Sequence, residues 1–146
     1  MPFQEMRQKL INRVKVLGLP RQGAPFPLVT LEEFFEGNDD SGSSAIGCNL
    51  VPELSPEFFY EKLKQIRSRP DVEDVLVEII EVEEQDLSMW PFSDRVYVFT
   101  KATKDQVAAW AAALRPDTVD EGFTNGKPSY LPESKPSVKA YSLWWD

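Results

Sequence analysis

VEDVLVEIIEV at residues 72–82 and RVYVFT at residues 95–100 are the two stretches that decide the fold. Both are rich in β-branched and aromatic residues, which pack well on the pleated, half-buried surface of a sheet. Apolar side chains alternate along each stretch, with Val75 and Val77 on one side of the first. The pattern therefore predicts two central strands, which the connection EEQDLSMWPFSD at residues 83–94 joins.

Helices are predicted before and after this pair of strands. Ser55 followed by Pro56 is a strong helix start, and the apolar side chains that follow at helical spacing are Phe59, Leu63 and Ile66. Thr103 and Gln106 form a capping box, in which each side chain hydrogen-bonds the other residue's backbone, and Pro116 ends this second helix. Its apolar stripe consists of Val107, Trp110, Ala111 and Leu114.

Two further strand patterns complete the predicted sheet. Residues 45–51 form a short apolar segment, and residues 138–146, VKAYSLWWD, alternate along the chain. From residue 45 onward the order of elements is then βαββαβ, and a ferredoxin-like α+β fold with an antiparallel sheet packs this order economically. We therefore predict a single domain over residues 1–146, with its core at residues 45–146 and an added helix at residues 1–19.

The added helix is predicted to be amphipathic. Its apolar residues recur at helical spacing, and they are Phe3, Met6, Leu10, Val14 and Leu17. Basic residues occupy its other face, and they are Arg7, Lys9, Arg13 and Lys15. A helix that docks on the domain with a solvated basic face is favoured, and attraction to an anionic membrane surface is the alternative.

The segment LVTLEEFFEGN at residues 28–38 can be interpreted in two ways. Thr30 and Glu33 form a capping box, which favours a short helix. A strand through residues 28–35 remains open. In either case, the acids of this segment lie next to the turn-forming run NDDSGSS at residues 38–44.

The sequence lacks the residue types of most familiar active sites. It has no histidine, which removes the usual general base and the commonest metal ligand, and it has no glycine loop of phosphate-binding spacing. Residues 38–44 match a calcium loop only in part, because Gly42 lies one place short of the required glycine. Cys48 stands among apolar residues and is predicted to be buried. We therefore expect no cofactor.

The charge of the chain is uneven and points to a basic partner. The net charge is −8, and residues 71–94 contain nine acids and no base. An acidic surface repels phosphate backbones, so nucleic-acid binding is disfavoured, whereas a basic protein would be attracted. No segment is apolar enough for a membrane span or an export signal, so we expect a cytoplasmic location.

Two aromatic features are candidates for a binding surface. Met89 to Asp94, MWPFSD, places Trp90 and Phe92 in a connection where polar turn residues would be expected. Trp144 and Trp145 are adjacent, so in a strand they point to opposite faces and one lies off the main core. Completion of the core is the simpler explanation for both features, and anchors at an interface are the alternative.

Three motifs carry a resemblance to a known family. VTLEEFFEGNDDSGSSAIGCNL, MWPFSDRVYVFT and the terminal WWD span most of the chain between them. At these motifs the chain resembles small bacterial proteins of an uncharacterised family. The resemblance implies a bacterial origin, and it carries no activity, cofactor or catalytic residue that could be transferred.

The leading functional hypothesis is a non-enzymatic acidic module that binds a basic protein, with an immunity-type inhibitor of a basic toxin as one instance. The predicted binding residues are Glu32, Glu33, Asp39, Asp40, Trp90, Phe92, Asp94 and Trp144. The alternative is a metal-dependent enzyme or regulator that uses the carboxylates of residues 32–40. The sequence indicates no oligomeric state.

Overall fold

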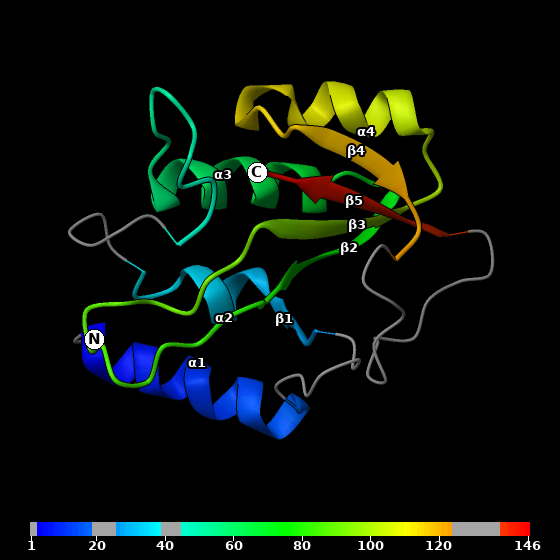
Figure 1. The fold of residues 1–146 in the computed structure, drawn as a ribbon. Coiled ribbons are helices and arrows are strands. Elements are labelled where there is room, and N and C mark those ends of the chain that lie inside the picture. The colour runs from blue at the N-terminus through cyan, green and yellow to red at the C-terminus, as the bar shows by residue number, and fades with distance from the viewer. Residues whose placement is uncertain (1–2, 19–25, 39–44, 124–137) are drawn as a thin grey trace.

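The computed structural model describes residues 3–18, 26–38, 45–123 and 138–146 (Figure 1). Its elements are α1 (Phe3–Leu17), β1 (Leu28–Thr30), α2 (Leu31–Phe35), α3 (Pro56–Arg67), β2 (Val72–Glu78), β3 (Arg95–Thr100), α4 (Lys104–Ala111), the 3-10 turn η1 (Ala112–Leu114), β4 (Thr118–Glu121) and β5 (Lys139–Trp144). The mixture of helices with one antiparallel sheet confirms the α+β class.

The sheet has five strands in the order β1-β2-β3-β5-β4, and every neighbouring pair is antiparallel. This order corrects the ferredoxin-like βαββαβ prediction. In that arrangement the first strand, expected at residues 45–51, would lie between residues 95–100 and residues 138–146. Here β5 pairs directly with β3, and β1 and β4 extend the two edges.

Residues 45–51 form turns and bends instead of a strand because the chain must pass over the core helix α3. Ile46 is fully buried, and Gly47 then reverses the chain at φ +63°, where Leu50 N donates to its carbonyl oxygen. A Cβ at Gly47 would lie 2.7 Å from Phe59 Cζ, so only glycine fits. Cys48, predicted to be buried, is exposed on the outside of this turn.

The segment with two interpretations contains both elements. Residues 28–30 pair with β2 as a strand, and the helix begins directly afterwards at Leu31. Thr30 Oγ1 accepts a hydrogen bond from Glu33 N at 3.0 Å, and Thr30 N donates to Glu33 Oε1 at 2.9 Å. The predicted capping box is thus confirmed, as is the one at Thr103 and Gln106.

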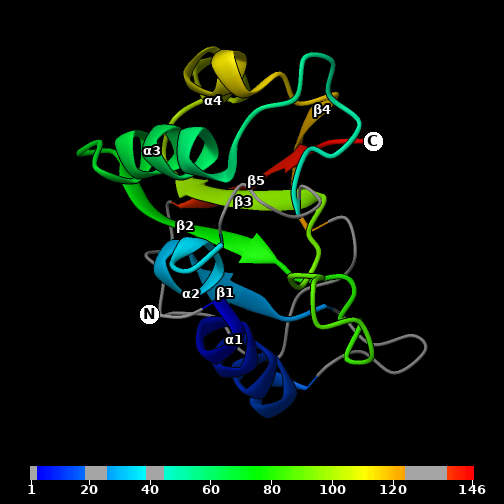
Figure 2. The same ribbon diagram turned by 90° about the vertical axis from the view of Figure 1, so that its left-hand side faces the viewer.

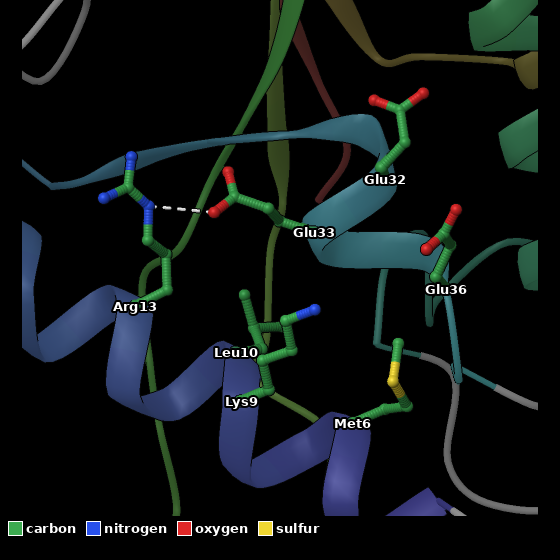
Figure 3. A pocket seen from close by; sticks show the side chains of 7 residues that line it. All are labelled: Met6, Lys9, Leu10, Arg13, Glu32, Glu33 and Glu36. Carbon is green, nitrogen blue, oxygen red and sulfur yellow. Dashed lines mark hydrogen bonds and ion pairs between the residues drawn. The ribbon is translucent and has the colours of Figure 1, made fainter. Parts of the chain in front are cut away.

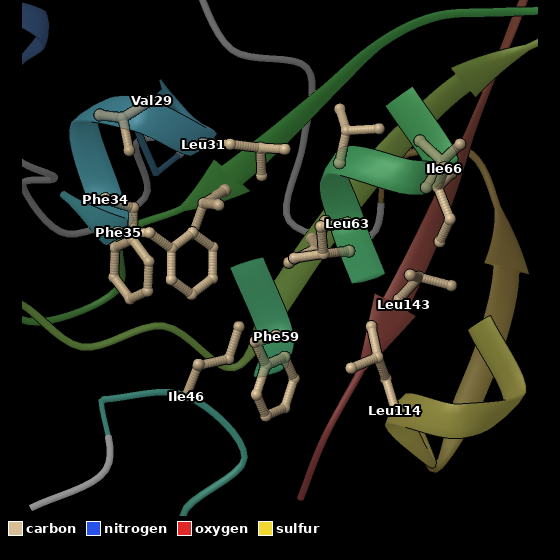
Figure 4. Packing of buried hydrophobic residues seen from close by; sticks show 14 of the residues in the cluster. Val29, Leu31, Phe34, Phe35, Ile46, Phe59, Leu63, Ile66, Leu114 and Leu143 are labelled. Carbon is tan, nitrogen blue, oxygen red and sulfur yellow. The ribbon is translucent and has the colours of Figure 1, made fainter. Parts of the chain in front are cut away.

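The main core lies between the sheet and the helices (Figures 1 and 2). Strand β3 is buried along its whole length, as a central strand should be. Phe59 of α3 packs edge-on against Trp145 with ring centroids 5.3 Å apart, and Trp145 Nε1 donates to the Leu114 carbonyl oxygen at 2.8 Å. Figure 4 shows how Phe59, Leu63 and Leu143 converge in this layer.

Helix α1 packs beside α2 and β1 and contributes Leu10, Ile11 and Val14 to the buried residues. It begins at Phe3 and ends at Leu17, within the residues 1–19 predicted for this helix. None of the helices in the described part of the chain is long and apolar enough to cross a membrane.

Gly37, directly after α2, supplies a test of how closely α1 and α2 pack. We expect Gly37→Ala to lower the free energy of unfolding by about 2–4 kcal/mol, because φ is +87° and the new Cβ would lie 2.6 Å from Met6 Cγ. Gly18→Ala is the matched control, since Gly18 has φ +86° but no atom within 4 Å of a Cβ, and it should cost only about 1 kcal/mol. Urea denaturation measures both. Equal losses of stability in the two variants would show that the Met6 side chain moves aside at no cost, which would contradict close packing of α1 and α2 at this point.

Candidate functional site

Arg7 of α1 is buried, with 2% of its surface exposed, and it binds the backbone of the β2–β3 connection. Its Nε donates to the Met89 carbonyl oxygen at 2.6 Å. Its Nη2 donates to the carbonyl oxygens of Glu83 at 2.6 Å and Asp86 at 3.0 Å. One side chain therefore fixes three points of residues 79–94, which we call the acidic connection.

Further contacts close the acidic connection at its base. Ile80 N donates to the Phe92 carbonyl oxygen at 2.9 Å, and Phe92 N donates to the Glu81 carbonyl oxygen at 2.8 Å. Trp90 lies beneath the connection, where its Nε1 donates to the Phe34 carbonyl oxygen at 2.8 Å and its ring contacts Phe3. The connection thus leaves the sheet and returns to it along a defined path.

The alternative that Trp90 is an exposed anchor does not hold, because only 4% of its surface is exposed. The simpler explanation, completion of the core, applies to it. The apolar residue that the connection exposes is Leu87, at 61%. Gln4 Nε2 donates to the Leu87 carbonyl oxygen at 2.6 Å, so the backbone at this exposed side chain is also held by α1.

The acidic side chains of the connection point into solvent. Glu81, Glu83, Glu84 and Asp86 are all exposed, and Glu84 forms an ion pair with Lys15 at 2.5 Å. The hydroxyl and amide groups of Ser88 donate to Asp86 Oδ1, and these hydrogen bonds lower the pKa of Asp86 from its ordinary value. Asp86 therefore stays ionised at neutral pH.

A second loop, at residues 45–52, is also tied by an arginine. Arg115 Nη1 donates to the Val51 carbonyl oxygen at 3.1 Å, its Nη2 donates to Pro52, and the Val51 side chain is 88% exposed. Ser93 N donates to the Ala45 carbonyl oxygen at 2.9 Å, which joins the start of this loop to the acidic connection. In Figure 2 both loops are on the side that faces the viewer, the second loop near α4 at the top and the acidic connection near α1 at the bottom.

The predicted acids of α2 are engaged by arginines from two other helices. Arg67 of α3 binds Glu32 through two hydrogen bonds of 2.7 and 2.5 Å, which lower the pKa of Glu32. Arg13 Nε of α1 lies 2.8 Å from Glu33 Oε2. Asp39 and Asp40 lie outside the described residues. Glu32 and Glu33 therefore join helices together, and the structure does not bring them to the acidic connection.

The other predicted site residues lie at the base of the acidic connection and beside it. Phe92 is half-buried in the closing bridge with Glu81. Trp144 Nε1 donates to Asp94 Oδ2 at 3.2 Å, and Trp144 is half-buried with the Arg95 guanidinium 6.0 Å from its ring centre. As predicted, only one of the adjacent tryptophans, Trp145, belongs to the main core.

Arg7, which the sequence pattern places on a solvated basic face, is buried. The signal was present in the spacing: Arg7 lies four residues after Phe3 and four before Ile11, so all three share one side of the helix. Ile11 is fully buried, and the side that carries it turns toward the interior. A charge among buried positions needs several hydrogen-bond acceptors, and here backbone carbonyl groups provide them.

A metal site is not formed by the residues that the structure describes. Within them, no group of three or more Asp, Glu or Cys residues is arranged to hold an ion. The carboxylates proposed for a metal-dependent enzyme include Asp39 and Asp40, which the structure does not describe, so that alternative stays a prediction.

Comparison with known proteins places the chain beside one family. The family model of the uncharacterised protein YfbO family matches residues 5–143. A curated relative, uncharacterised protein YfbO of Escherichia coli strain K12, is 37% identical over 123 residues, which is 84% of this chain and 84% of the relative. No solved structure matches. These matches confirm the resemblance to an uncharacterised bacterial family, and neither name states an activity.

Arg7→Met is the direct test of the arginine contacts. We expect it to lower the free energy of unfolding by about 2–4 kcal/mol, because three backbone carbonyl groups lose the buried donor that binds them. Amide hydrogen exchange should quicken across residues 83–89 more than in the sheet. Lys9→Met on the exposed side of the same helix is the control and should change neither. Unaltered exchange at residues 83–89 would contradict the assigned role of Arg7.

The pair between Glu32 and Arg67 predicts a pH dependence. The pKa of Glu32 is lower in the folded state than its ordinary value of 4.5, so the pair stabilises the fold above that pH and loses its effect as pH falls further. Because both side chains are partly exposed, we expect Glu32→Gln to cost only about 0.5–1 kcal/mol at pH 7. The difference from wild type should shrink as the pH falls below 4.5 and Glu32 becomes protonated. Denaturation curves at several pH values check this, and a constant difference would contradict it.

Proposed function

The chain belongs to the YfbO family of uncharacterised proteins, and we propose that it is a non-enzymatic module that binds a basic protein partner. The observation that carries the proposal is the acidic connection held rigidly by Arg7. The proposed binding surface consists of the exposed residues Glu81, Glu83, Glu84, Asp86 and Leu87 of this connection.

The charges of this surface favour a basic partner. Within the described residues, the ion pair with Lys15 engages Glu84, and no other ion pair involves an acid of the proposed surface. The hydrogen bonds of Arg7 go to backbone oxygens and not to the carboxylates of these acids. The local field is therefore negative, and such a field raises the rate of encounter with a positively charged protein.

The fixed backbone of the acidic connection favours binding, because little conformational entropy is lost when a partner binds it. Ordering a flexible loop at an interface opposes association, and a loop that is already in its bound shape avoids that cost. Arg7, Gln4 and Trp90 all hold the acidic connection from beneath. None of these contacts uses a carboxylate of the connection or the Leu87 side chain.

The exposed aliphatic side chain of Leu87 would act as an apolar anchor within this acidic surface. Protein interfaces commonly combine apolar anchors with a polar rim. An immunity-type inhibitor of a basic toxin is one instance of such a module, and protection against a toxin encoded beside the gene would support that instance.

The test is affinity capture from a bacterial lysate with three forms of the protein. We expect wild type to retain a basic protein that elutes as salt is raised, because the attraction between exposed charges is screened. Glu81→Gln, Glu83→Gln and Asp86→Asn together should reduce its capture by about tenfold or more. Leu87→Ser, tested alone, should reduce it through the lost anchor.

A triple variant on other surfaces is the matched control. Glu57→Gln, Glu73→Gln and Asp105→Asn remove the same charge from α3, β2 and α4, where all three side chains are exposed. This control should retain the partner at the wild-type level. If both triple variants lost the partner, binding would depend on the net charge of the protein and not on the proposed surface. If both retained it, the assigned surface would be contradicted.

A further inference from the structure

A pocket of about 270 Å³ lies between α1 and α2, away from the proposed protein-binding surface (Figure 3). The described residues that line it are Met6, Lys9, Leu10, Arg13, Glu32, Glu33 and Glu36. Met6 and Leu10 supply an apolar part, and charged side chains from both helices supply the rest. Pockets for drug-sized ligands begin at about 300 Å³, so this one suits a molecule of about ten heavy atoms.

Most charges around the pocket are already paired. Glu33 is paired with Arg13 across the space between α1 and α2, as the dashed line in Figure 3 marks. Glu32 turns away toward Arg67 of α3 and is bound there by two hydrogen bonds. These pairs fix the pocket walls and leave Lys9 and Glu36 as the lining charges without an ion pair among the described residues.

Lys9 and Glu36 carry opposite charges but stay apart. Lys9 comes from α1 and Glu36 follows the end of α2, and no ion pair within 4.0 Å joins them. Figure 3 shows the Lys9 ammonium turned toward the space between the two helices, and Glu36 borders the same pocket at the end of α2. A ligand with a single charge would match one of them and leave the other without a partner in the pocket.

We infer that this pocket binds a small zwitterion with an aliphatic body, of the class of α-amino acids with aliphatic side chains. The ligand's carboxylate meets the Lys9 ammonium, its ammonium meets the Glu36 carboxylate, and its aliphatic part lies on Met6 and Leu10. The inference does not depend on the proposed protein-binding function, because α2 and the pocket side of α1 form no part of the acidic connection.

Three related probes test the need for both charges. L-Leucine carries both, N-acetyl-L-leucine lacks the ammonium and L-leucinamide lacks the carboxylate. In an NMR titration of the full chain, we expect L-leucine to shift the amide signals of residues around Lys9 and Glu36. Each blocked probe should bind about tenfold more weakly or worse, because it loses one of its two ionic contacts. Equal binding of all three probes, or no shift with L-leucine, would overturn the inference.

Charge exchange at the two exposed residues gives an independent readout. Lys9→Glu and Glu36→Lys, made singly, should each reduce binding of L-leucine by about tenfold, since one contact becomes repulsive. The double exchange should restore binding, because a zwitterion can enter in the reverse orientation. Lys104→Glu and Glu57→Lys are matched controls on α4 and α3 and should bind as wild type does. A double exchange that fails to restore binding while the chain remains folded would overturn the assigned contacts.

Discussion

The hydrogen bonds of the buried Arg7 guanidinium hold together parts of the molecule that the sheet alone would leave apart. A cation that leaves water without partners loses several kcal/mol of solvation, so Arg7 can be buried only where acceptors converge. The carbonyl oxygens of Glu83, Asp86 and Met89 converge on it. The docking of α1 and the path of the acidic connection therefore depend on each other. Without the connection the Arg7 guanidinium would lack acceptors, and without α1 the three carbonyl oxygens would lack this donor.

The choice of carbonyl oxygens as partners has an electrostatic consequence. A buried arginine paired with a carboxylate would cancel one negative charge, whereas carbonyl dipoles stabilise the cation and leave the carboxylates unchanged. Glu81, Glu83 and Asp86 thus keep their charge on the outside of the connection, while the positive charge of Arg7 lies beneath and reduces their mutual repulsion. A rigid loop with a dense negative surface becomes possible because its counter-charge is on the inside.

Sequence reasoning succeeded here where the causes are local. The capping boxes at Thr30 and Thr103 each depend on two residues three apart, and the alternation in β2 and β3 depends on neighbours along the strand. It failed where the cause is a distant partner. The pairing of β5 with β3, the pairs of Glu32 and Glu33 with arginines of other helices, and the burial of Trp90 beneath α1 are all long-range. Composition predicted an acidic surface, but which acids face solvent depends on those contacts.

Helix α1 was predicted as an addition to the core. It contributes Arg7 to the acidic connection and Lys9 to the pocket, although these residues are only two positions apart. In an α-helix, two residues correspond to a rotation of about 200°, so Arg7 and Lys9 must point in nearly opposite directions. Arg7 reaches the acidic connection, and Lys9 borders the pocket beside α2. The apolar side chains between these two directions, Leu10 and Val14, fix the rotation of the helix by their burial. Any change that rotated or released α1 would therefore alter the connection and the pocket together, which makes the packing of this helix the condition for both.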